Sequence, residues 1–108
     1  MASDNTELPH PDRDDLQLTD VLFALSDPER LAVVRQLASG PLEMAQCHLT
    51  DPLIPKSTKS HLMKVLREAG IIRSEPLGRG RRLSLRRDDL EARFPGLIGS
   101  VLAASIDD

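Results

Sequence analysis

Apolar residues spaced three or four positions apart predict amphipathic helices along most of the chain. The first such stretch runs from about residue 14 to 25, where Leu18, Val21, Leu22 and Leu25 share one face. Aspartates in its first turn suit the positive end of the helix dipole. We therefore expect the folded domain to begin with this helix.

Two further helices are expected before residue 50. Asp27 and Pro28 mark the start of one that runs to about Ala38, because aspartate is a favourable N-cap and proline fits the first helical position. A Gly-Pro pair ends it. A short third helix is then expected over residues 42–49.

A fourth helix is predicted over residues 55–69, and its two faces differ in kind. One face is apolar and suited to a core. The other carries short polar or cationic side chains, which are poor choices for a helix needed only for packing, since Ser and Thr compete for backbone hydrogen bonds. The sequence therefore predicts a helix that presents a surface to a partner.

A β-hairpin and a last helix complete the pattern. Residues 71–72 and the alternating Leu83 and Leu85 flank a Gly-Arg-Gly turn, which is typical of a hairpin. The last helix starts at Asp88, with a kink or break at Pro95-Gly96. The prediction is a mainly α fold in the order four helices, a two-stranded β-hairpin, and a fifth helix.

One domain accounts for this order. Residues 1–13 are polar, acidic and interrupted by two prolines, so they are predicted to be a flexible acidic arm. Residues 14–106 form the predicted domain. Only two of the 108 residues are aromatic, which favours packed helices and argues against a stacking platform for single-stranded nucleic acid.

The net charge of −3 conceals a segregation of charge along the chain. Residues 1–51 carry three basic and ten acidic side chains, residues 52–87 carry ten basic and two acidic, and residues 88–108 are acidic again. A single cationic block in an acidic chain is typical of a surface that meets a polyanion. The alternative is a solvated face that the flanking acids neutralise.

No secretory signal or membrane span is visible in the sequence. Cys47 is the only cysteine, so no intrachain disulfide is possible and a cytoplasmic location is expected.

Short helix, loop, helix and basic hairpin together make the layout of a winged helix-turn-helix. A B-DNA major groove admits one α-helix, and short side chains at the helix N-terminal half can reach base edges. A hairpin rich in Gly and Arg can lie on the neighbouring minor groove or phosphates. The sequence therefore predicts that helix 55–69 reads the major groove and that the basic wing 73–87 contacts adjacent DNA.

Three segments in this order resemble the ArsR-type winged helix family of bacterial transcriptional repressors: "ALSDPERLAVVRQLASGPL", "PKSTKSHLMKVLREAGII" and "GRGRRLSL". The resemblance covers roughly residues 20–87. It implies a homodimer, paired through the first and last helices, that binds a two-fold symmetric operator and is released by a signal. The chain departs from the family at Leu62, where histidine is usual, and at Lys59, which replaces an apolar residue.

The candidate site residues follow from these patterns. The DNA-binding set is Lys56, Ser57, Lys59, Ser60, His61, Lys64, Arg67, Arg79, Arg81 and Arg82. The dimer-interface set is Leu18, Leu22, Leu97, Ile98, Val101 and Leu102.

Neither of the family's two zinc-type sites is present, because Cys47 has no second cysteine and residues 88–108 contain no histidine. No metal or other cofactor is therefore expected. Cys47 is a possible redox residue, although a buried small apolar side chain is the commoner role.

Two functions of different classes remain open on the sequence alone. The first is a dimeric, sequence-specific repressor that binds double-stranded DNA. The second is a winged-helix module that docks an acidic protein surface with the same helix. An enzyme is not expected, because no nucleophile–base pair or phosphate loop is apparent.

Overall fold

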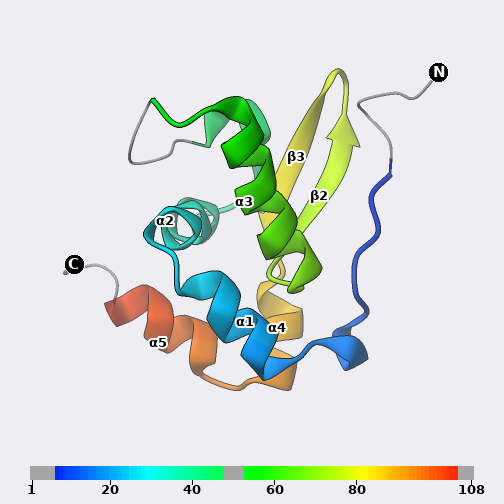
Figure 1. Ribbon diagram of the computed structural model, residues 1–108. Helices are drawn as coiled ribbons and strands as arrows, with labels where there is room; N and C mark the ends of the chain where they lie inside the picture. Colours follow the sequence, from blue (N-terminus) through cyan, green and yellow to red (C-terminus); the bar gives the residue numbers. More distant parts are fainter. Residues whose placement is uncertain (1–6, 48–52, 105–108) are drawn as a thin grey trace.

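The computed structural model describes residues 7–47 and 53–104, and its elements confirm a mainly α winged-helix architecture. In chain order they are η1 (Arg13–Asp15), α1 (Leu18–Leu25), α2 (Pro28–Leu37), β1 (Leu42–Glu43), η2 (Met44–Gln46), α3 (Lys56–Glu68), β2 (Ile72–Leu77), β3 (Gly80–Leu85), α4 (Arg87–Arg93) and α5 (Leu97–Ala104). The β2–β3 hairpin stands beside α3 (Figure 1).

The start of α2 is the one that the sequence predicts. The Asp27 carboxylate accepts hydrogen bonds from the backbone N–H groups of Glu29 and Arg30, both at 3.0 Å, and Pro28 opens the helix. The Arg30 side chain is buried and donates back to the carbonyl oxygens of Ala24 and Phe23 at the end of α1. This arginine ties the two helices together across their short connection.

The sheet has three antiparallel strands in the order β1-β3-β2, one more than predicted. The hairpin pairs Ile72 with Leu85 and Leu77 with Gly80. On the other edge of β3, Leu42 pairs with Leu83 and Glu43 with Arg82. The predicted helix over 42–49 is therefore wrong at residues 42 and 43, because the edge of β3 pairs with their backbone as β1. Residues 44–46 form only the single 3-10 turn η2. Residues 48 and 49 lie outside the described residues.

The C-terminal helical stretch is divided in two, at the Pro95-Gly96 position that the sequence marks. Helix α4 ends at Arg93 and α5 begins at Leu97. Gly96 has a φ of +81°, a left-handed conformation that favours glycine over other residues. The break turns α5 back along the domain.

One apolar core joins all of these helices to the sheet. Aliphatic side chains fill it, together with Cys47 and Met63, and neither phenylalanine is fully buried. Its largest fully buried side chains are Leu16, Val21, Val33, Val34, Leu37, Cys47, Leu66, Ile71, Ile72, Leu83, Leu90 and Ile98.

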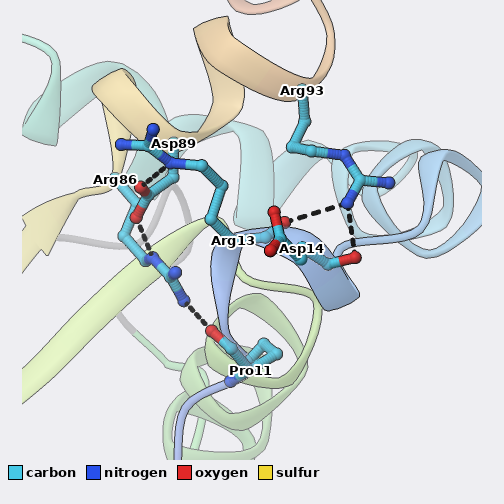
Figure 2. Close-up of polar contacts among 6 residues, drawn as sticks. All are labelled: Pro11, Arg13, Asp14, Arg86, Asp89 and Arg93. Carbon is cyan, nitrogen blue, oxygen red and sulfur yellow. Dashed lines mark hydrogen bonds and ion pairs between the residues drawn. The ribbon is translucent and has the colours of Figure 1, made fainter.

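Residues 7–13, the described part of the predicted flexible arm, lie against the domain and extend it before residue 14. The Arg86 guanidinium donates to the carbonyl oxygen of Pro11 at 2.7 Å and to Asp89 at 2.9 Å (Figure 2). Arg13 donates to the other Asp89 oxygen at 2.7 Å. The hydrogen bond from Arg13, followed by that from Arg86, holds the pKa of Asp89 below its usual range. The sequence pattern does not reveal this docking, because most of its acceptors are main-chain carbonyls.

Gly70 ends α3 at a point where no larger residue fits. Its φ is +84°, and a Cβ atom there would lie 2.0 Å from Cδ2 of buried Leu16. Gly70→Ala should therefore lower the free energy of unfolding by about 3 kcal/mol, combining left-handed strain with overpacking.

Gly78→Ala is the matched control, since Gly78 also has a left-handed φ, of +57°, but nothing lies within 4 Å of the point where a Cβ atom would be added. It should cost only about 1 kcal/mol. Urea unfolding of both variants checks the pair, and equal losses would contradict the close approach of Leu16.

Candidate nucleic-acid interface

Helix α3 is seated on the core by one face and leaves the other open. Leu62, Met63 and Leu66 are buried, and their spacing places them on the side that packs against the domain. The residues that the structure leaves exposed or partly exposed on the opposite side are Lys56, Ser57, Ser60, His61 and Lys64. Five of the predicted DNA-binding residues therefore share one accessible helix surface, which we call the reading face.

Lys59 is turned away from the reading face. Its ammonium group donates to the carbonyl oxygens of Cys47 at 2.7 Å and Met44 at 3.0 Å. These carbonyls belong to η2 and the residue that follows it, so the lysine fastens the N-terminal half of α3 to the preceding turn. The structure gives the ammonium group a positioning contact within the domain, and the predicted DNA contact of Lys59 stays a prediction.

Arg67 is also used internally. The residue is only 8% exposed, and its guanidinium donates to the carbonyl oxygen of Pro9 at 2.6 Å. The N-terminal segment covers it and leaves its guanidinium little exposed, and the predicted DNA contact through Arg67 stays a prediction. The helical wheel places Arg67 on the flank of the polar face, but it cannot reveal a segment that packs over that flank.

The three wing arginines of the predicted DNA-binding set lie in three different environments. Arg79 lies exposed at the hairpin turn. Arg81 is half-buried on the side of the sheet that faces α3, where it lines a hollow with Ser60 and Lys64. Arg82 is exposed on the other face, where its register partners are Glu75 on β2 and Glu43 on β1.

Ser74 orients Arg81 and was not anticipated from the sequence. Its hydroxyl accepts from Arg81 Nε at 2.7 Å, and its carbonyl accepts from Nη2 at 3.0 Å. The alternation of Ile72 and Ser74 along β2 places both on the face toward the domain interior, and a buried serine on such a face is the signal that could have indicated a polar contact.

The predicted dimer residues fall into two groups. Leu18 and Leu22 on α1 are each 46% exposed, and Leu18 shares a surface hollow with Leu97 at the start of α5. Val101 and Leu102 are partly exposed on α5. Ile98 is 2% exposed and packs in the core of its own chain, so it offers little surface to a second copy.

Cys47 lies in the core, 2% exposed. Burial raises the pKa of its thiol, and the nearby positive charge of Lys59 opposes that shift. A thiol in this environment carries little thiolate, which favours the apolar packing role over a redox role. Among residues 7–47 and 53–104, no group of three or more His, Cys, Asp or Glu side chains is placed to hold a metal ion.

No helix in the described part of the chain has the length and apolar character that crossing a bilayer demands.

Together, an exposed polar helix and a basic hairpin beside it are typical of a winged helix-turn-helix. No family model matches the chain. It is 34% identical over 86 residues to the uncharacterized HTH-type transcriptional regulator YceK of Bacillus subtilis, covering 79% of this chain and 86% of YceK.

Solved structures of transcriptional regulators have a similar fold. An ArsR family transcriptional regulator matches 77% of this chain and 90% of its own, with a TM-score of 0.65 and 24% identity. The transcriptional repressor BigR from Xylella fastidiosa matches 71% and 85%, with a TM-score of 0.56 and 25% identity. A possible transcriptional regulator for arsenical resistance matches 82% and 95%, with a TM-score of 0.61 and 28% identity. The chain belongs to the HTH-type transcriptional regulators. Its fold is that of the solved ArsR family transcriptional regulator.

The inward role of Lys59 gives a direct test. Lys59→Met keeps most of the aliphatic stem but removes the ammonium group that donates to two carbonyls, so it should lower the free energy of unfolding by about 1–2 kcal/mol. Lys56→Met, three residues earlier on the exposed face, should change it by less than about 0.5 kcal/mol. Denaturant unfolding measures both, and an equal effect would contradict the assignment.

Proposed function

We propose that this chain works as a homodimeric, cytoplasmic repressor that binds a two-fold symmetric operator in double-stranded DNA. Helix α3 inserts its reading face into the major groove, and the wing contacts the adjacent backbone. The observation that carries the proposal is the reading face itself: five short or cationic side chains, accessible together on a helix whose other side is fixed in the core.

The dimensions of duplex DNA fit this surface. A major groove about 12 Å wide accepts one α-helix with short side chains. Ser57 and Ser60 carry hydroxyl groups that both donate and accept, and His61 adds an imidazole, so the face can pair with base edges of either kind. Lys56 and Lys64 lie on the same surface and suit the flanking phosphates.

The arginines of the wing differ in how much positive charge they can offer to DNA phosphates. Arg79 is exposed at the tip, in the turn between the two paired strands, and Arg81 is held toward the reading face by Ser74. Arg82 faces two glutamates across the sheet, so part of its charge is offset within the protein. We therefore assign the main phosphate contacts of the wing to Arg79 and Arg81.

Dimerisation would place two reading faces on successive turns of the duplex. Exposed leucines on α1 and partly exposed apolar residues on α5 provide the surface for it. A two-fold dimer of this kind binds half-sites about 34 Å apart, and this symmetry makes the operator a palindrome.

A winged-helix module that docks an acidic protein is the second candidate, because the same cationic face would suit it. Salt dependence separates the two. Each phosphate contact releases condensed counterions, so the logarithm of the DNA-binding constant should fall linearly with the logarithm of salt concentration. Selection of bound duplexes from a random library, followed by titration at several salt concentrations, tests the proposal. Failure to enrich any sequence, with no salt dependence, would contradict it.

Replacing Ser60 and His61 together by Ala should remove base contacts without altering the fold. We expect the preference for the selected operator over random duplex to fall at least ten-fold, since a lost base contact costs about 1–3 kcal/mol. Light scattering should show an unchanged dimer. Undiminished discrimination would show that α3 does not read the bases.

Arg79→Ala should instead weaken binding to operator and random duplex alike, and should reduce the magnitude of the salt slope by about one. Arg35→Ala is the matched control, because Arg35 is an exposed arginine on the α5 side of α2. The control should leave the slope unchanged. Equal slopes in the unaltered chain and in Arg79→Ala would exclude the wing tip from the DNA contact.

A further inference from the structure

Residues 8–11, which we call the N-terminal strap, connect the two elements that meet DNA. At one point Arg67 of α3 donates to the carbonyl oxygen of Pro9, 2.6 Å away. Beyond it, Arg86 donates to the carbonyl oxygen of Pro11 at the base of the wing (Figure 2). Both arginines are less than a tenth exposed, so each of these hydrogen bonds is shielded from solvent.

His10 lies between these two anchors and completes the edge of the sheet. Its Nε2 atom accepts a hydrogen bond from the backbone N–H of Ser74, with 3.0 Å between the nitrogens. Strand β2 is at the edge of the sheet, so this N–H points away from β3. The imidazole takes the place of a missing neighbouring strand, and it accepts only while Nε2 is unprotonated.

Ser74 is also the residue that orients Arg81 of the wing. A continuous series of contacts therefore runs from Arg67 on α3, through the strap and Ser74, to Arg81. Leu8, at the start of the strap, lines the same hollow as Ser60 and Lys64. The strap therefore contacts both α3 and the wing, and these contacts constrain the distance between the two elements.

We propose that the N-terminal strap holds the wing at the position relative to α3 that DNA binding requires, and that His10 is the positioning residue that makes this hold depend on pH. The inference rests on the proposed DNA-binding function. His10 acts through Ser74 and Arg81 and has no assigned contact with DNA.

The surroundings of His10 oppose its protonation. Burial is the largest cause that lowers its pKa, followed by the positive charges of Arg73 on β2, Arg67 on α3 and Arg86 at the end of β3. A backbone hydrogen bond at Leu8 opposes this shift. The acids near His10 in sequence are Glu7 and Asp12, and Asp89 of α4 is already paired with Arg13 and Arg86.

The sign of the pH dependence follows from this shift. In the docked strap His10 has a pKa below its ordinary value of 6.5, so the docked state binds fewer protons than the released state. The contribution of His10 to docking is fully present above its ordinary pKa of 6.5 and is lost as the pH falls through the lowered pKa.

The test compares His10→Ala and His10→Gln in the full chain. Glutamine can place its side-chain oxygen near the position of Nε2 but does not titrate. At pH 7.5 and without DNA, hydrogen exchange at the Ser74 amide should rise several-fold in His10→Ala and stay near its original rate in His10→Gln. Gln17→Ala, an uncharged change at an exposed position nearby, should leave the exchange unchanged.

DNA affinity is then measured with random-sequence duplex at low salt, so that no operator is required. At pH 7.5 His10→Ala should bind about five-fold more weakly, as expected for the loss of one hydrogen bond, and His10→Gln should bind as the unaltered chain does. Between pH 7.5 and 5.5 the unaltered chain should lose about five-fold relative to His10→Gln. Both proteins contain the other histidines, whose contributions cancel in this comparison.

Each possible failure has a distinct meaning. Unchanged Ser74 exchange in a folded His10→Ala protein, with the fold checked by circular dichroism, would show that His10 does not hold the Ser74 amide and would overturn its positioning role. Faster exchange with unchanged DNA affinity would reduce the strap to a purely structural contact. If the DNA affinities of the unaltered chain and of His10→Gln changed with pH in parallel, His10 would not be the residue that makes the hold depend on pH. Absence of any duplex binding by the unaltered chain would overturn the proposed function and the positioning role together.

Discussion

The burial of one face of α3 is the constraint on which the rest of the structure depends. Leu62, Met63 and Leu66 each contribute about 2 kcal/mol when removed from water, and together they fix the rotation of the helix about its axis. That rotation decides which residues face outward. Rotating α3 by one position would expose leucine and bury lysine, so the chemistry of the reading face is determined by its apolar side.

The cationic block has a second role that its sequence does not display. Lys59, Arg67 and Arg86 donate to main-chain carbonyl oxygens. These side chains fasten the turn, the N-terminal segment and the wing around α3. The surface available to a polyanion is therefore smaller than the number of positive charges suggests, and it is correspondingly better defined in shape.

Residue patterns predicted the elements whose signals are local. The N-cap at Asp27, the hairpin turn and the two faces of α3 each depend on neighbours a few positions away, and each is confirmed. The patterns missed long-range contacts with the backbone. Pairing of Leu42 with Leu83 replaced a predicted helix, and the carbonyl oxygen of Pro9 captured Arg67. Such acceptors are common to every residue type, so no spacing of side chains indicates which one is used.

The most direct test of the account is to map the surface of the protein that duplex DNA contacts in solution. Backbone amide chemical shifts of the labelled chain, followed during titration with a duplex about three helical turns long, would map it. The account predicts the largest changes over residues 56–64 and 79–81, with the buried positions of α2 nearly unaffected. Changes centred on α1 and α5, with residues 56–64 unmoved, would contradict it.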